Sequence, residues 1–520
     1  MYHLKYLLLF YFCLYSGILY AENILRVAIP HHVGDMNPQG YGTNEMFAQN
    51  MIYEGLVKTN KEGKIIPSLA ISWEIKDSGK TYIFTLRKDV KFSNGEEFNA
   101  HAVKKNFDSI LKNRIRHSWA ELPMIIESVN VQDDYSIILQ LKRAYTPTLE
   151  ELSLVRPFRF IAPSQIPDDL DLIKHTPKPI GTGPYKFVKS NLGVSDTFQK
   201  NENYWDKAKY NGIYFDTIFM RIITEPNSKL VALKTKQIDL IYGFDEIPIE
   251  IFHNVSQTKE FNVFSSPAIS TTFMAINPKN EPLSSPIMRK AIVQGINKEV
   301  LIRAVFYNYQ KIANFLFAPD MPYSNLVGFT PIQYNHTEAK KNIESLGYIL
   351  GKDGFYSKGN KRLEFELMYI GNNPAQKAMA EILQSQFKDI GIFLKLSAND
   401  PTIYFNRQSS AMFDLSFSIT WGIPYEPLIM LKSMRHGGHV SSILQYLPNK
   451  DEFYGKIEHV LKLLNTPLEK YTKELLTELY TLDVYIPLTY QTNKAIARKE
   501  IKGIKMGVQV FEIPFWEFYK

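Results

Sequence analysis

The stretch NMIYEGLVKTNKEGKIIPSLAISWEIKDSGKTYIFTLRKDVKFSNGEEFNAHAVKKNF (residues 50–107) carries the strongest fold signal in this chain. Its segment TYIFTLRKDVKF (residues 81–92) alternates aromatic and polar side chains and follows the turn-forming triplet Asp77-Ser78-Gly79. Alternation with a period of two is typical of a strand that buries one face, and the preceding turn indicates a hairpin. We therefore interpret this segment as scaffold.

A helix is predicted at the end of the same stretch. Asn99 can cap it, because an asparagine side chain accepts hydrogen bonds from the free N–H groups of a first helical turn. The apolar residues after the cap recur at helical spacing and would bury one face; they are Val103, Phe107, Ile110 and Leu111. The pattern ends near Asn113, so Arg114, Arg116 and His117 fall just beyond the helix.

Strand and helix signals also occur near the two ends of the chain. NILRVAIP (residues 23–30) is a short apolar strand that runs into the turn-rich loop HHVGDMNPQGY (residues 31–41), and loops at strand ends usually line clefts in α/β domains. LEFELMY (residues 363–369), a helix over about residues 375–390 and IFLKLS (residues 392–397) form a β-α-β unit. This unit indicates a second α/β lobe.

The first residues are typical of a cleaved secretory signal. Lys5 precedes an apolar run over residues 6–15, and the less apolar stretch that follows this run ends in Leu19-Tyr20-Ala21. The run is shorter than the roughly 20 residues of a membrane-spanning helix. We expect cleavage after Ala21 and a soluble mature chain, with an uncleaved N-terminal anchor as the alternative.

Composition excludes several classes of protein. The only cysteine, Cys13, lies in the predicted signal, so the mature chain has no disulfides, cysteine–zinc sites or cysteine nucleophiles. The 520 residues exceed the size of one typical domain. The net charge of +7 falls to +6 without Lys5 and is spread along the chain, which indicates a solvated basic surface and no nucleic-acid partner.

Further motifs follow the opening stretch. They are NRIRHSW (residues 113–119), RPFRFIAPSQ (residues 156–165), IGTGPYKF (residues 180–187), NENYW (residues 201–205), MRKAIVQGINKEVLI (residues 288–302) and TWGIPYEP (residues 420–427). Together these motifs and the opening stretch resemble the peptide/nickel family of extracytoplasmic solute-binding proteins, family 5, nearly end to end. NRIRHSW and RPFRFIAPSQ are similar to the nickel-binding branch of that family.

The resemblance implies a two-lobed periplasmic-binding-protein fold (class II, cluster C type) with a ligand cleft between α/β lobes. After the signal peptide (residues 1–21), lobe I would comprise residues 22–265 and 493–520, with an inserted subdomain around residues 50–185. Lobe II would comprise residues 266–492. The chain would cross between the lobes near residues 266–273 and return near residues 485–492.

The resemblance also implies a function in transport. The protein would capture nickel in the periplasm as a complex with a small chelator such as L-histidine, and deliver it as a monomer to the permease subunits of an ABC importer. The alternative within the family is a peptide or haem receptor, for which Asp414 or Glu426 could hold an α-amino group. An enzyme is disfavoured because the chain has no H-E-x-x-H, G-x-S-x-G or G-x-x-x-x-G-K-[ST] motif.

Nickel favours neutral imidazole among protein ligands. His439 in SMRHGGHVSS (residues 433–442) matches the family position that supplies the metal-ligating histidine. His436, His31 and His32 are departures from the family pattern and are further candidate ligands, or else solvated loop residues. We interpret His117 as a packing residue.

The remaining nickel ligands would come from water or from a chelator whose rim carries carboxylates. Arginine suits such a rim because its planar guanidinium makes bidentate bonds to carboxylates. Arg156 and Arg116 match the carboxylate-binding positions of the family, although most arginines are simply surface charge. Residues matching the pocket wall, where aromatic faces would exclude water, are Tyr41, Met46, Trp119, Trp421 and Tyr425.

Overall fold

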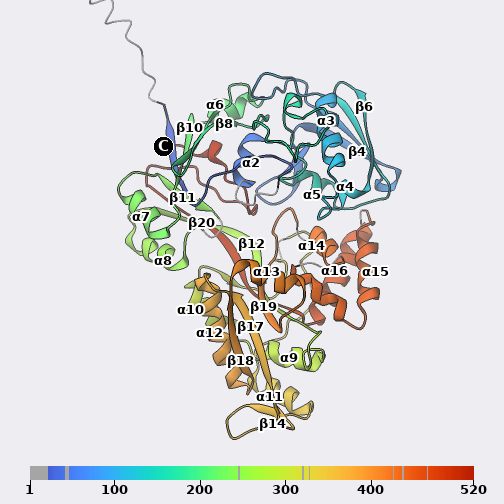
Figure 1. Ribbon diagram of the computed structural model, residues 1–520, viewed down its shortest axis with the longest axis vertical. Coiled ribbons are helices and arrows are strands. Elements are labelled where there is room, and N and C mark those ends of the chain that lie inside the picture. The colour runs from blue at the N-terminus through green and yellow to red at the C-terminus, as the bar shows by residue number, and fades with distance from the viewer. Residues whose placement is uncertain are drawn as a thin grey trace, which may run out of the picture.

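The computed structural model describes residues 22–40, 46–243, 246–318, 321–326, 328–425, 427–435, 439–464 and 466–520. The predicted signal peptide, Tyr41, Glu426 and His436 lie outside these residues. In the described part, the chain forms two lobes of helices and strands, and its C-terminus lies in the first lobe (Figure 1). No helix of this part is long and apolar enough to cross a membrane.

One 11-stranded sheet runs through both lobes in the order β18-β17-β19-β12-β20-β11-β1-β10-β9-β8, and β13 pairs with β20 off this path. In the first lobe its strands are β1 (Ile24–Ile29), β8 (Tyr185–Asn191), β9 (Ser195–Lys200), β10 (Thr217–Ile222) and β11 (Leu240–Gly243). In the second lobe they are β13 (Lys311–Ile312), β17 (Glu364–Ile370), β18 (Phe393–Asn399) and β19 (Leu415–Ile419).

Two long strands, β12 (Asn262–Ile276) and β20 (Tyr485–Ala497), connect the lobes (Figure 1). They pair antiparallel from Asn262↔Ala497 to Ala275↔Tyr485, with register shifts near Ser265 and Ala268. At the first lobe β20 pairs with β11, and at the second β12 pairs with β19. Bulges bend paired strands locally, so β12 and β20 form a bent antiparallel pair between the lobes. The predicted crossover segments lie within these strands, and the predicted lobe limits stay predictions.

The two faces of β12 belong to different cores, because successive side chains of a strand point to opposite faces. Phe273 and Ala275 pack into one cluster of buried residues. Met274 and Ile276 pack into another, together with residues of β17, β19 and the helices beside them. Trp421 packs against the first of these clusters, which places the segment after β19 on the Phe273 face.

The opening stretch folds into a separate four-stranded sheet in the order β4-β5-β7-β6. Its strands are β4 (Ala70–Lys76), β5 (Thr81–Leu86), β6 (Ile126–Asp133) and β7 (Ser136–Leu141). The predicted hairpin is confirmed, with Asp77 and Ser78 at positive φ in the turn. The predicted strand was too long: β5 ends at Leu86, the N–H of Arg87 donates one last ladder bond to the carbonyl of Leu69, and residues 88–89 form a bend.

The predicted helix is confirmed as α3 (Ala100–Lys112), whose cap Asn99 accepts a hydrogen bond from the N–H of Ala102. The other helices of the first lobe are α2 (Met46–Ile52), α4 (Leu122–Ile125), α5 (Thr148–Ser153), α6 (Lys207–Gly212), α7 (Pro226–Lys234) and α8 (Ile249–Thr258). A short hairpin of β2 (Val57–Thr59) and β3 (Ile65–Pro67) lies beside them.

In the second lobe, the predicted β-α-β unit is confirmed by the parallel strands β17 and β18 and by α12 (Pro374–Asp389) between them. The other helices are α9 (Pro286–Gln294), α10 (Lys298–Phe306), α11 (His336–Ser345), α13 (Pro401–Ser409), α14 (Leu428–Ser433), the 3-10 helix η4 (His439–Tyr446), α15 (Lys450–Val460) and α16 (Thr466–Thr481). A small sheet contains β14 (Ile349–Leu350), β15 (Tyr356–Lys358) and β16 (Lys361–Arg362).

Candidate functional site

Three of the predicted wall residues form one aromatic cluster between the lobes. Trp119 lies between α3 and α4 of the first lobe, and Trp421 and Tyr425 lie between β19 and α14 of the second. The ring centroids of Trp119 and Tyr425 are 6.5 Å apart, and Trp421 meets Tyr425 edge to face at 5.9 Å. Leu154 and Ile429 pack against the rings. Rings from both lobes therefore build a single wall.

Arg156 belongs to the same cluster. It follows α5 across a short turn, and its Cζ lies 6.0 Å from the centre of the Trp119 ring. Burial raises the pKa of Tyr425 to about 12, while the positive charge of Arg156 opposes that rise. The charge of Arg156 thus acts on residues of both lobes at the point where they meet.

The positive charges of Arg116 and Arg156 both act on the imidazole of His117, which lies between α3 and α4. His117 is only 2% exposed. Burial lowers its pKa to about 4, and the charges of Arg116 and Arg156 lower it further in the same direction. His117 is therefore neutral at neutral pH, which agrees with the packing role predicted for it. Two arginines whose charges act on the same histidine favour a ligand with carboxylates.

The buried imidazole of His117 makes the stability of the protein depend on pH. Below pH 6.5 the unfolded chain takes up a proton at this histidine that the folded protein does not bind until about pH 4, so stability falls as the pH falls through this window. For His117 the loss is about 2 kcal/mol between pH 6.5 and about pH 5. Thermal melts at both pH values should show a smaller loss for His117→Gln than for the unmodified protein. Equal losses would contradict the buried neutral imidazole.

Trp119 also carries a free donor. Its indole Nε1 is buried and has no hydrogen-bond partner among the residues that the structure describes. A buried donor without a partner is destabilising by about 1–3 kcal/mol. An acceptor atom on a bound ligand would remove this cost.

The predicted histidines lie in different places. His439 is the first residue of η4, which follows α14 and Arg435 in the second lobe. His31 is exposed. In the described part of the chain, no group of three or more His, Cys, Asp or Glu side chains is arranged to hold a metal. A metal bound here by His439 would therefore need ligands from outside the described side chains.

His32 is held by the β8–β9 hairpin. Its Nδ1 lies 2.9 Å from Oδ1 of Asp196, and its Nε2 accepts a hydrogen bond of 2.7 Å from the N–H of Gly193. The second bond requires a lone pair on Nε2, so the proton sits on Nδ1 and points to the carboxylate. Among the described residues, no contact joins His32 to the aromatic cluster. Ligation by His32 would require it to give up the bond from Gly193.

Met46, predicted as a wall residue, is buried at the first position of α2. Asp414, a candidate for holding an α-amino group, instead accepts hydrogen bonds from Nδ2 of Asn280 at 2.7 Å and from the N–H of Glu366 at 2.9 Å. These partners place it inside the second lobe, among its own strands.

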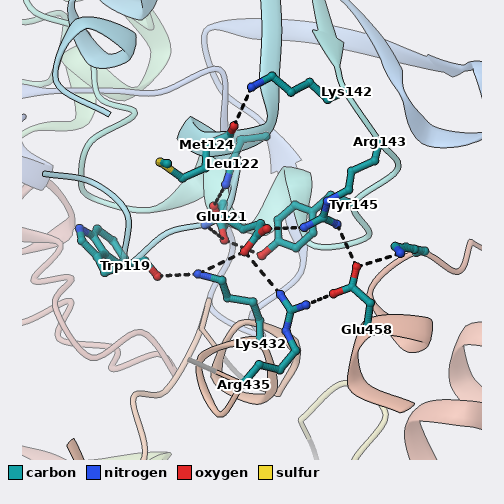
Figure 2. A network of polar contacts seen from close by, with 12 residues as sticks. Trp119, Glu121, Leu122, Met124, Lys142, Arg143, Tyr145, Lys432, Arg435 and Glu458 are labelled. Carbon is teal, nitrogen blue, oxygen red and sulfur yellow. Dashed lines mark hydrogen bonds and ion pairs between the residues drawn. The ribbon is translucent and has the colours of Figure 1, made fainter. Parts of the chain in front are cut away.

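A network of ion pairs bridges the lobes beside the aromatic cluster (Figure 2). Glu121 of the first lobe forms ion pairs with Arg143 of the same lobe and with Lys432 and Arg435 of the second, the latter two at 3.4 and 3.5 Å. Arg143 and Arg435 also pair with Glu458 of α15. Residues far apart in the sequence thus meet here, and of these only Arg435 lies within a motif singled out from the sequence.

The network connects directly to the candidate site. Lys432 Nζ donates a hydrogen bond of 3.0 Å to the carbonyl of Trp119 (Figure 2), and Arg435 is the last described residue before the loop that leads to His439. Glu151, which is fully buried, accepts from the N–H groups of Glu121 and Leu122 at 3.0 and 2.8 Å. The pairs therefore position one wall residue and the start of the histidine loop relative to each other.

The protein has two α/β lobes joined by a bent strand pair, and aromatic and arginine side chains from both lobes lie at their junction. These features define a two-lobed solute-binding protein. The chain matches the family model described as bacterial extracellular solute-binding proteins, family 5 middle, over residues 64–442. It belongs to this family, and the predicted two-lobed α/β fold is confirmed.

The chain is similar to several characterised relatives. It is 38% identical over 501 residues to the nickel-binding periplasmic protein of Escherichia coli (strain K12), covering 95% of this chain and 94% of that protein. It resembles the crystal structure of NikA from Brucella suis in complex with Fe(III)-EDTA with a TM-score of 0.91 and 37% identity, covering 95% of this chain and 99% of the other. The glutathione-binding protein GsiB of Salmonella choleraesuis (strain SC-B67) is 26% identical over 73% of this chain and 70% of its own length.

Proposed function

We propose that this protein captures nickel(2+) as a complex with a small carboxylate-bearing chelator such as L-histidine, and delivers the complex to the permease subunits of an ABC importer. The observation that carries the proposal is the 38% identity over 95% of the chain with a relative named for nickel binding in the periplasm. We place the protein in the periplasm as a monomer, with its signal peptide removed after Ala21.

In this proposal each candidate site residue has a chemical role. His439 supplies an imidazole ligand, with His436, His31 and His32 as further candidates. Arg156 and Arg116 bind the carboxylates of the chelator. Trp119, Trp421 and Tyr425, with Tyr41 and Met46, exclude water from the complex.

The arrangement of the site supports capture by closure of the lobes. Arg156 and Trp119 belong to the first lobe, while Trp421, Tyr425 and η4 with His439 belong to the second. A ligand that contacts both sides favours the closed form by as much as it binds that form more tightly. The closed form would then be the one that the importer recognises.

Calorimetry on the metal-stripped protein without its signal peptide tests the proposal. One titration uses nickel premixed with excess L-histidine, and the other uses bare nickel in a non-chelating buffer. Tight one-to-one binding that requires histidine supports the chelate. Equal binding of bare nickel would mean that protein imidazoles do most of the ligation. No binding in either titration would contradict the proposal and favour a peptide ligand, as in the glutathione-binding relatives.

Replacing Arg156 separates chelator recognition from metal ligation. We expect Arg156→Ala to weaken binding of the nickel–histidine complex by about ten- to a hundredfold, because a charge-assisted hydrogen bond contributes about 1.5–3 kcal/mol. Binding of bare nickel should change little. Arg114→Ala is the matched control, since Arg114 is exposed on the neighbouring loop. Equal losses for both variants would rule out a specific carboxylate contact at Arg156.

A further inference from the structure

A separate pocket of about 220 Å³ lies in the first lobe. It is bounded by the end of α2, the β2–β3 hairpin, α6 and the C-terminal segment, residues 509–517. Ligand pockets in proteins usually have volumes of roughly 300–1,000 Å³, so this one suits a very small molecule. It lacks the residues to which the nickel complex is assigned above.

Several charged groups of this pocket already have partners. Lys61 forms an ion pair of 2.5 Å with Glu517. Glu54 accepts hydrogen bonds from Thr182 Oγ1 at 3.0 Å and from Trp205 Nε1 at 2.8 Å. These groups form the frame of the pocket and are not available to a ligand.

Other charged groups that line the pocket lack such partners. Glu512 and Lys58 form no ion pair or hydrogen bond with any side chain in the part of the chain that the structure describes. Lys209 has only its Nζ placed over the Trp516 ring, 4.2 Å from the ring centre. Yet the carboxyl of Glu512 is sufficiently buried that desolvation raises its pKa. Opposite charges line this small pocket without forming ion pairs with each other. A bound ligand that carries charges of both signs would compensate them.

Arg159 is the buried cation of this pocket. It is 7% exposed, and its Nη2 donates to Asn50 Oδ1 at 3.2 Å and to the carbonyl of Ser153 at 3.0 Å. Its Nε is buried and has no hydrogen-bond partner among the described residues. Burial lowers its pKa to about 10, so the guanidinium keeps its charge at neutral pH. A buried charged donor without a partner is costly, and an anionic acceptor in the pocket would satisfy it.

The pocket lies next to the proposed nickel site and shares none of the residues assigned to it. A narrow cavity runs from Arg159 and Glu512 to Pro424 and Tyr425. Tyr425 is 8% exposed and belongs to the aromatic cluster. Tyr425 therefore lines this narrow cavity and also belongs to the aromatic cluster.

We propose that this pocket binds a small acidic amino acid, such as L-glutamate, independently of the metal. The lining groups for which the described residues provide no ion-pair partner carry three positive charges, on Lys58, Lys209 and Arg159, and one negative charge, on Glu512. An acidic amino acid carries the complementary set, two carboxylates and one ammonium group. Glu512 receives the ammonium group, Arg159 receives one carboxylate through Nε, and the two lysines receive the other.

Calorimetric titration of the metal-stripped protein with L-glutamate, without nickel, tests this site. We expect one-to-one binding, weaker binding of succinate, which lacks the ammonium group, and at least about tenfold loss of glutamate affinity in Glu512→Gln and Lys209→Gln. Lys207→Gln is the matched control, because Lys207 lies two residues away on α6 and does not line the pocket. Lys58→Gln removes the charge of another lining residue and provides a second test in case the substitution at Glu512 impairs folding.

The nickel–histidine titration on the same variants separates the two proposals. The second site predicts that Glu512→Gln and Lys209→Gln bind the nickel complex as the unmodified protein does. Absence of glutamate binding, equal binding of succinate, or unchanged glutamate affinity in the variants would overturn the inference. Parallel loss of glutamate and nickel–histidine binding would also overturn it, since it would mean a single shared site.

Discussion

Replacing His439 by alanine is expected to weaken nickel binding by at least about a hundredfold. Loss of groups that merely orient a metal ligand changes metal affinity by about ten- to a hundredfold, and His439 is proposed as a ligand itself. The residue opens η4 and follows the loop after α14, so truncation of its side chain should leave the helices beside it intact. Calorimetry with nickel and L-histidine, and thermal melts of both proteins, measure the two effects.

His101→Ala is the matched control for this substitution. His101 is an exposed histidine of α3 in the first lobe, so it tests whether any imidazole on the protein contributes to the signal. The control should bind the nickel complex as tightly as the unmodified protein. Unchanged affinity of His439→Ala would show that nickel is held by the chelator or by another histidine, and His436, His31 and His32 would then be tested in turn.

Replacing Lys432 by methionine is expected to destabilise the protein by about 3–5 kcal/mol, the usual result of removing one partner of a buried ion pair. The side chain of Lys432 is 2% exposed; it pairs with Glu121 and also compensates the charge of the buried Glu151. Its loss also removes the hydrogen bond to the carbonyl of Trp119. Chemical denaturation measures the stability, and calorimetry should show weaker nickel–histidine binding as well.

Lys462→Met is a suitable control for Lys432→Met. Lys462 pairs with Glu458 of the same network, but its side chain is 47% exposed, and exposed ion pairs contribute about 0–1 kcal/mol. The control should therefore change stability by at most about 1 kcal/mol. If Lys432→Met kept both the stability and the affinity of the unmodified protein, the ion pairs across the lobes would not contribute to closure.

Local patterns in the sequence predicted local structure well. The hairpin before β5, the capped helix α3 and the β-α-β unit of the second lobe are confirmed, because turn residues, helix caps and the periodicity of apolar residues act over a few positions. The strand at residues 81–92 was predicted too long. Its end depends on where the pairing with neighbouring strands stops, and the last bond to the β4 side joins Arg87 to Leu69.

The assembly of the site could be predicted only through the family resemblance. Motifs in three parts of the chain indicated Trp119, Arg156 and Tyr425, and the structure brings these residues together. Their roles with nickel stay predictions. For His32, the sequence indicated a loop after a strand, whereas its actual partner, Asp196, lies 164 residues further along the chain.

The sequence by itself determined the α/β elements, the family and the residue types available for a metal complex, because these depend on short-range patterns and on motifs in a preserved order. Only the tertiary structure decided which charges meet. Glu121 pairs with Lys432 and Arg435 across the lobes, and Arg159 and Glu512 line one pocket. Such contacts join positions hundreds of residues apart. Their energies depend on burial and distance, which no local stretch of sequence specifies.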